Sequence, residues 1–137
     1  MKELDFQARL VKHTIDRGGW GRKMAQKFQS GMPDLFLKMR TTHGVFIECK
    51  KDKLGLTELQ RETIRRMQKA GIFAGWALYL SQEGTATEHH VLVGADADAI
   101  KATSDNSTII TLSGKIWGVD ELINSVVYWS DRELEQM

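Results

Sequence analysis

Two short segments joined by a tight turn constrain the fold of this chain more than any other feature. Residues 35–40 alternate between apolar and more polar side chains, and residues 45–50 form a second strand-like segment. A period of two is typical of half-buried strands, so the pair predicts an antiparallel hairpin. Because successive side chains on a strand point to opposite faces, Glu48 and Lys50 share one face and Cys49 lies on the other.

A helix is predicted on the N-terminal side of this hairpin. An apolar stripe with spacings of four, three and four residues predicts a helix over residues 3–17. The stripe consists of Leu4, Ala8, Val11 and Ile15. Gly18 and Gly19 end this helix, because glycine accepts the left-handed backbone of a helix C-cap. Residues 22–29 fit a helix or a strand, and we favour a strand.

A second helix and a buried strand are predicted after the hairpin. Thr57 and Gln60 match the capping-box pattern of a helix N-terminus, and Gly71 closes that helix. Residues 72–80 are nearly all apolar, which favours a strand buried on both faces. Residues 90–93 are a weaker strand candidate.

The composition excludes several classes of protein. The chain has 137 residues, 42% of them hydrophobic and 27% charged, which is typical of a soluble globular protein. No apolar run approaches the ~20 residues that cross a bilayer, and no secretory signal is recognised, so we expect a cytoplasmic protein. With Cys49 as its one cysteine, the chain has neither an internal disulfide nor a multi-cysteine zinc site.

The charges are unevenly distributed along the chain. Residues 1–69 hold 16 basic and 8 acidic residues, and residues 70–137 hold 3 and 10, which gives net charges of +8 and −7. Such a split indicates that the first half meets a polyanion, although a charge run is also compatible with a plain solvated face.

The residues that suggest chemistry all lie in the basic half. Asp34 follows a proline, and Glu48 and Lys50 follow on the second strand of the hairpin. Two neighbouring carboxylates repel unless a cation lies between them, and oxygen ligands suit Mg²⁺. A lysine beside such a site can stabilise the charge that develops on a phosphodiester. The alternative is an ordinary Glu–Lys pair on a strand with an aspartate in a turn.

The order of these motifs resembles the VRR-NUC family of the PD-(D/E)XK nuclease superfamily. The resemblance covers about residues 1–80 and is carried by the segments Gly31–Leu35, Val45–Lys50, Leu56–Gln60 and Ala70–Gly71. It implies an α/β, restriction-endonuclease-like αβββαβ core with a mixed central sheet. Residues 81–137 are then a small C-terminal α/β extension of the same single domain, 1–137.

The resemblance also implies site residues and a cofactor. Asp34 and Glu48 match the metal-binding carboxylates, Lys50 the catalytic lysine and Gln60 a helix glutamine that faces the site. The backbone carbonyl of Cys49 and the side chain of Glu3 match further metal ligands. The implied cofactor is Mg²⁺, with Mn²⁺ as a substitute. The residues expected to contact nucleic-acid phosphates are Lys51, Lys53, Arg22, Lys23 and Lys27.

The function implied is metal-dependent cleavage of phosphodiester bonds in DNA. Stand-alone members of the family occur in bacteriophages, act as homodimers and resemble enzymes that cut Holliday junctions or other branched DNA. For a phage-encoded member, the compartment would be the cytoplasm of the bacterial host. Two alternatives stay open: an inactive nucleic-acid-binding module of the same fold, and a small α/β interaction protein.

Overall fold

The order of helices and strands follows the one expected from the sequence. The computed structural model describes residues 3–24, 31–51, 56–80, 90–95 and 97. The elements are α1 (Glu3–Asp16), β1 (Trp20–Lys23), β2 (Leu35–Lys38), β3 (Val45–Lys51), α2 (Glu58–Lys69), β4 (Ala74–Leu80) and β5 (His90–Gly94). The αβββαβ core is thus confirmed, and β5 follows it. Beyond residue 97, the predicted C-terminal extension lies outside the described residues.

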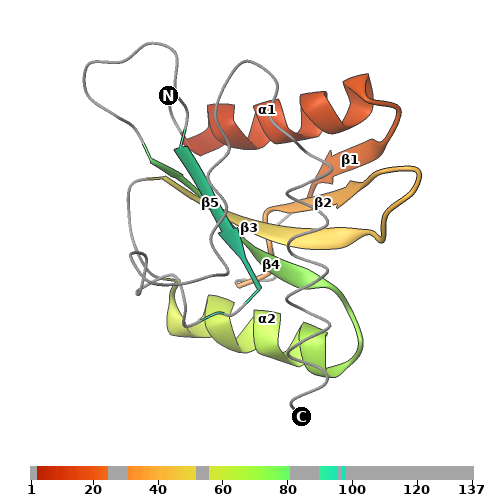
Figure 1. Ribbon diagram of the computed structural model, residues 1–137. Helices are drawn as coiled ribbons and strands as arrows, with labels where there is room; N and C mark the ends of the chain where they lie inside the picture. The colour runs from red at the N-terminus through yellow and green to blue at the C-terminus, as the bar shows by residue number, and fades with distance from the viewer. Residues whose placement is uncertain (1–2, 25–30, 52–55, 81–89, 96, 98–137) are drawn as a thin grey trace.

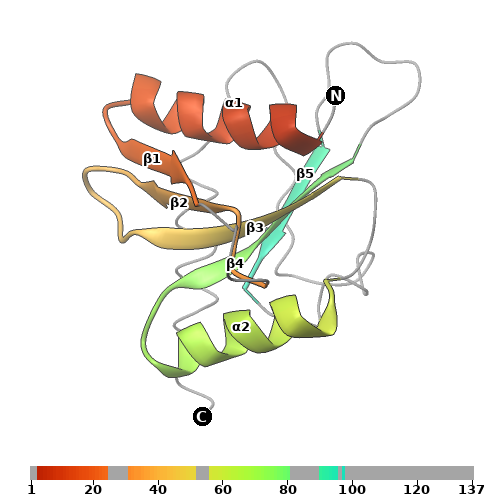
Figure 2. The same cartoon turned by 180° about the vertical axis from the view of Figure 1, so that it is seen from behind.

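The described strands form one mixed sheet in the order β1-β2-β3-β4-β5. β1 and β2 are antiparallel, and so are β2 and β3, which confirms the predicted hairpin. β3 and β4 are parallel, because α2 carries the chain back across the sheet, and β5 is antiparallel to β4. Figures 1 and 2 show α1 on one face of this sheet and α2 on the other.

Each face of the sheet has its own hydrophobic core. On the α1 side, Phe6 and Leu10 pack with inward-facing residues of β2, β3 and β4, such as Ile47. On the α2 side, Ile64 packs with Trp76 and other residues. Residues 74–79 of β4 are buried on both faces, as expected for a central strand.

The apolar stripe that predicts α1 is not the buried face of that helix. Leu4 and Ile15 are 62% and 51% exposed, whereas Phe6 and Leu10 are fully buried. The aromatic ring of Phe6 contacts that of Tyr79, with ring centroids 5.5 Å apart, so the larger side chains of the neighbouring face determine how α1 packs. The stripe is left on the outer side of the helix.

The helix ends follow the predicted signals. Gly18, just after α1, and Gly71, just after α2, both have positive φ angles, of 86° and 83°. The expected strand over residues 22–29 begins earlier, at Trp20, and residues 25–30 lie outside the described part of the chain. No helix within the described residues is both long and apolar enough to span a bilayer.

Candidate active site at the β2–β3 hairpin and the start of α2

Asp34 stands just before β2, opposite the middle of β3. In the antiparallel register Leu35 pairs with Ile47, so the preceding residue, Asp34, lies beside the peptide that joins Glu48 to Cys49. Its Oδ2 atom accepts a hydrogen bond of 2.8 Å from the backbone amide of Cys49. The antiparallel register therefore brings the aspartate, fifteen residues before Cys49 in sequence, to the strand that carries Glu48.

Two further contacts position the segment that leads to Asp34. The backbone oxygen of Asp34 accepts a 2.8 Å hydrogen bond from the amide of Met24, which ties it to the end of β1. Gly31 has a φ of +88°, and a Cβ atom there would lie 2.7 Å from the side chain of Leu59 on α2. A side chain at this position would therefore strain the backbone and displace the Leu59 side chain.

Glu48 is a nearly buried acid on the α2 face of the sheet. It is 3% exposed and pairs with Trp76 of β4 in the parallel register. Its Oε1 atom accepts a 2.8 Å hydrogen bond from the side-chain amide of Gln60. Burying a carboxylate costs free energy, and a neutral amide donor compensates less of that cost than a cation would. The position is therefore suited to a cation.

Gln60 connects the capping box of α2 to this acid. Its side-chain Oε1 accepts a 2.9 Å hydrogen bond from the backbone amide of Thr57, while the backbone amide of Gln60 donates a 3.1 Å hydrogen bond to the Thr57 hydroxyl. With the oxygen held by the cap, the Nε2 group is directed at Glu48. The predicted capping box is confirmed, and the same glutamine also reaches the site.

Lys50 and Cys49 lie where strand alternation predicts. Lys50 follows Glu48 by two residues on β3, so both belong to the same face, and Lys50 is half-buried. The Cys49 side chain is fully buried in the core on the α1 side, so its thiol points away from Glu48. The thiol is a core side chain, and a metal could use only the backbone oxygen of this residue.

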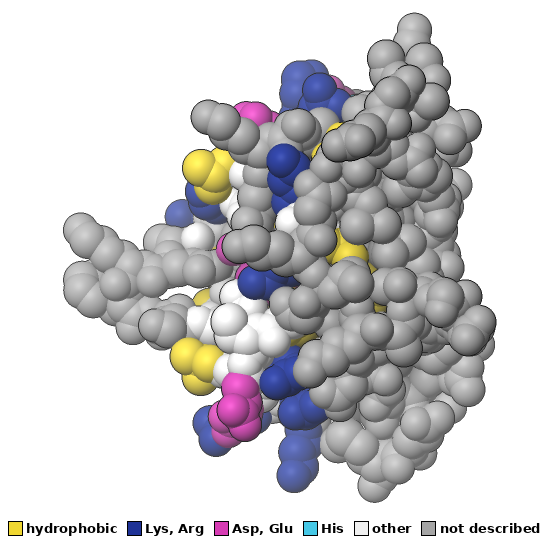
Figure 3. Space-filling view, turned by 90° about the vertical axis from the view of Figure 1, so that its left-hand side faces the viewer, with side chains coloured by type: hydrophobic (Ala, Val, Ile, Leu, Met, Phe, Trp, Pro, Cys, Tyr) yellow, Lys and Arg dark blue, Asp and Glu magenta, His cyan; other side chains and the backbone are white. Residues whose placement is uncertain are grey.

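The other predicted site residues differ in exposure, and some of their side chains lie outside the described part of the structure. Glu3 is the first residue of α1, and its side chain lies outside the described part of the structure, as do Lys27 and Lys53. Arg22 and Lys23 are exposed on β1, and Lys51 is half-buried at the end of β3. Figure 3 shows Lys and Arg side chains spread from the top to the bottom of the side of the molecule where both helices begin.

The ligand atoms available here are oxygens, the type that a hard divalent ion such as Mg²⁺ prefers. Asp34 and Glu48 offer carboxylate oxygens, and the Cys49 carbonyl adds a third oxygen from the same stretch of β3. Among the described side chains, no group of three His, Cys, Asp or Glu residues could hold a metal ion alone. An ion here would therefore rely on backbone oxygen and on water, as Mg²⁺ commonly does.

Gln7 is a buried polar residue of α1 whose sequence pattern predicts no role. This side chain is 5% exposed and lines a groove between α1 and β1 together with Lys23. The signal available in the sequence was its position one helical turn after Glu3, on a face that neighbours the apolar stripe.

A protein family and a solved structure are similar to this chain. A family model described as "VRR-NUC domain" matches residues 3–78. The search of curated proteins found no match. Among solved structures, the chain is similar to Hjc from Archaeoglobus fulgidus, described as a Holliday junction resolvase from an archaeal hyperthermophile. That match has 18% identity and a TM-score of 0.44, and it covers 66% of this chain and 71% of the other.

Proposed function

Because the chain belongs to the VRR-NUC domain family, whose model spans more than half of it, it is a nuclease domain, and we propose that it is a Mg²⁺-dependent DNA endonuclease. The observation that carries this proposal is the hydrogen bond from the Cys49 amide to Asp34. It holds one carboxylate against the strand that presents the second, Glu48, and Lys50. Two carboxylates that can hold a metal ion, with an ammonium group beside them, can together assist hydrolysis of a phosphodiester.

In this proposal the acids bind the ion and Lys50 acts on the substrate. Asp34, Glu48 and the Cys49 carbonyl would hold Mg²⁺, with Mn²⁺ as a substitute and Glu3 as a further ligand. When bound, the ion supplies Lewis-acid chemistry that neutralises developing charge on the phosphate. The Lys50 ammonium orients the attacking water or stabilises the charge of the transition state.

Gln60 acts as a positioning residue. Its amide holds one oxygen of Glu48 while the capping box holds Gln60 itself, so the carboxylate has a fixed orientation before substrate arrives. Such preorganisation reduces the reorganisation that the site must undergo during the reaction.

Basic residues around the centre are proposed to bind the DNA backbone. Arg22, Lys23 and Lys51 can neutralise phosphates on either side of the scissile bond, and we expect Lys27 and Lys53 to add to them. We further propose branched DNA as the substrate and a homodimer as the active form. A two-fold pair of sites matches two antiparallel strands, so each subunit would cut one strand.

The test is a cleavage assay on three DNA forms. The purified protein is incubated with linear duplex, flapped duplex and a four-way junction, with Mg²⁺, Mn²⁺ or EDTA. We expect cleavage with either metal, none with EDTA, and faster cutting of the branched substrates. Cleavage that is equally fast in EDTA would overturn the metal site, and equal rates on all three substrates would overturn the substrate preference.

A second candidate function is an inactive DNA-binding module of the same fold. The exposed basic residues of β1 favour binding to DNA whether or not the site cuts. Salt-dependent binding without cleavage under any metal condition would support this alternative.

A further inference from the structure

Three aromatic side chains form a row across the first three strands of the sheet. The ring of Trp20 on β1 lies 5.9 Å from that of Phe36 on β2, centroid to centroid, and the ring of Phe36 lies 4.9 Å from that of Phe46 on β3. Trp20 is 56% exposed, and both phenylalanines are half-buried. This aromatic row is therefore a continuous apolar surface that the described fold leaves partly open.

The aromatic row lies on the same face of the sheet as the candidate active site. Phe46 precedes Glu48 by two residues on β3, so both side chains belong to the α2 side. The two leucines that flank Phe36 on β2 belong to the core on the α1 side, so Phe36 also belongs to the α2 side. Asp34 precedes Phe36 by two residues. Since two residues of a strand span about 7 Å, the row begins about that far from both carboxylates.

Helix α2 reaches only one end of the aromatic row. Ile64 of α2 belongs to a hydrophobic cluster that includes Phe46, but neither Phe36 nor Trp20 is part of that cluster. In the sheet order β1-β2-β3-β4-β5, Trp20 stands on the edge strand farthest from β4, the strand on which α2 packs. The end of the row that carries the exposed indole therefore lies beyond the core beneath α2.

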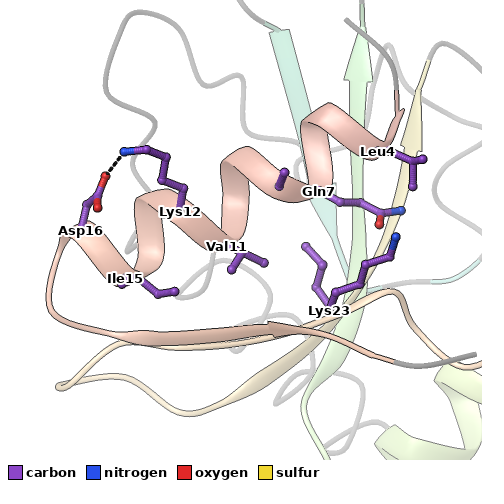
Figure 4. A pocket seen from close by; sticks show the side chains of 9 residues that line it. Leu4, Gln7, Val11, Lys12, Ile15, Asp16 and Lys23 are labelled. Carbon is purple, nitrogen blue, oxygen red and sulfur yellow. Dashed lines mark hydrogen bonds and ion pairs between the residues drawn. The ribbon is translucent and has the colours of Figure 1, made fainter.

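A cation accompanies the aromatic row, and β1 and β2 contain no acidic residue. Arg22 is exposed and pairs with Phe36 in the antiparallel register, so both side chains belong to this face. The next residue, Lys23, instead lines the groove on the α1 side, where it lies beside Gln7 (Figure 4). Lys38 donates hydrogen bonds to two backbone oxygens of the hairpin turn. An aromatic surface with a cation beside it complements the bases and phosphates of a nucleic acid.

The flat faces of such rings can be used only by bases that have left the duplex stack. In a duplex, each base is already stacked on its neighbours and presents only its edges in the grooves. An unpaired base exposes its face, and aromatic side chains with a basic residue nearby are the usual way in which proteins bind single strands. A flap or a branch point supplies such bases, whereas an intact duplex does not.

We propose that the aromatic row binds unpaired DNA bases beside the active site, with Trp20 as the main stacking ring and Arg22 on an adjoining phosphate. This inference rests on the proposed nuclease function and names the feature of branched DNA that the protein recognises. Because the row and Glu48 share one face of the sheet, a strand whose backbone crosses the site can place its neighbouring bases on the row.

The test measures whether Trp20 and an unpaired base interact directly. Binding is followed in EDTA, at one salt concentration, by fluorescence anisotropy of labelled DNA. One DNA is a flapped duplex, and the other is the same duplex with abasic residues throughout the flap, which keeps the phosphates and removes the bases. The wild type should bind the flap with bases about tenfold more tightly, the effect of stacking one base. Trp20→Ala should bind the two DNAs almost equally.

Three further variants distinguish stacking from other effects. Trp20→Phe keeps an aromatic ring and should retain most of the preference for bases, whereas Trp20→Leu is apolar without a ring and should lose it. Ile15→Ala is the matched control, since Ile15 is 51% exposed on α1, on the other side of the sheet, and should leave the preference unchanged. Because each protein is compared on two DNAs, the ratio does not depend on how much of a variant is folded.

The outcomes separate this inference from the proposed function. Equal binding of the two DNAs by the wild type, or a full preference in Trp20→Leu, would overturn the stacking role. An equal loss on both DNAs in Trp20→Ala would also overturn it and assign the aromatic row to another occupant, such as a partner protein. Metal-dependent cleavage without a preference for bases would leave the nuclease proposal intact. A preference that depends on Trp20 in a protein that cuts no DNA would support the row and contradict the activity.

Discussion

Asp34 accepts a 2.8 Å hydrogen bond from the backbone amide of Cys49. The contact joins the segment just before β2 to the backbone of β3, so the aspartate serves both as part of the hairpin and as a carboxylate beside Glu48. Because its position is set by the backbone of β3, the placement of Asp34 does not depend on which side chain occupies position 49.

We expect neutral substitutions in the centre to abolish cleavage without unfolding the protein. Asp34→Asn keeps an oxygen that can accept the Cys49 hydrogen bond but removes the charge, and Glu48→Gln and Lys50→Met remove the other two charges. Each should lower the cleavage rate by roughly 100-fold or more. The control is Glu62→Gln, an exposed acid paired with Arg66 on α2, which should cleave like the wild type. Undiminished cleavage in the three site variants would contradict the mechanism.

Substitutions can separate the role of Gln60 in the capping box of α2 from its role in positioning Glu48. Gln60→Glu keeps a side chain that can accept from the Thr57 amide, but it removes the donor to Glu48 and adds a second negative charge beside it. We expect slower cleavage, and the metal-free variant should also be less stable, because its two adjacent carboxylates repel. Thr57→Ala removes the cap and should lower the free energy of unfolding by about 1 kcal/mol. Rates at saturating Mg²⁺ and denaturant melts measure both effects, and equal cleavage by Gln60→Glu and wild type would exclude the positioning role.

Alanine substitutions at Gly31 and Gly71 test whether contact with α2 positions the segment before Asp34. Gly31 and Gly71 have φ angles of 88° and 83°, but an added Cβ atom would meet Leu59 at 2.7 Å only at Gly31. Gly71→Ala should cost about 1 kcal/mol of stability from backbone strain alone. Gly31→Ala should cost more and should also reduce cleavage, since the loop must move away from α2. If the two alanine variants have equal stability and equal activity, the contact with α2 does not position the site.

The lysines near the centre should make DNA binding sensitive to salt. Each phosphate contact contributes about 0.9 to the slope of the logarithm of affinity against the logarithm of salt concentration on duplex DNA. Lys23→Met and Lys51→Met should each reduce the slope by about one contact. Lys12→Met is the comparison, because Lys12 is paired with Asp16 at 2.7 Å on the outer side of α1. Slopes equal to that of the wild type would show that the two lysines do not contact phosphates.

His13 should make the stability of α1 depend on pH. Burial, with a further contribution from the positive charge of Arg17, holds the pKa of His13 below its ordinary value of 6.5. The unfolded chain therefore binds the proton more tightly, and stability decreases as the pH falls from above 6.5 through the lower pKa of the folded state. Compared with His13→Gln, the wild type should lose stability over this window in thermal melts. Parallel pH profiles for the two proteins would exclude the effect.

Local signals along the sequence determined most of the secondary structure. The alternation of residues 35–40 and 45–50, the Thr57 capping box and the glycines after both helices act within a few residues, so each could be recognised without the fold. The approach of Asp34 to β3 depends on the register between β2 and β3, which these local signals do not determine. The family resemblance supplied the roles of the residues at the site.

The sequence by itself determined the order αβββαβ, the face shared by Glu48 and Lys50, and the concentration of positive charge in the first half of the chain. Tertiary structure decided that α1 packs through Phe6 and Leu10 and leaves Leu4 and Ile15 exposed, and that Gln60 reaches Glu48. The reason is that periodicity identifies an apolar face but not the surface it meets. Which face a helix buries depends on the shape and area of side chains from strands far away in the sequence.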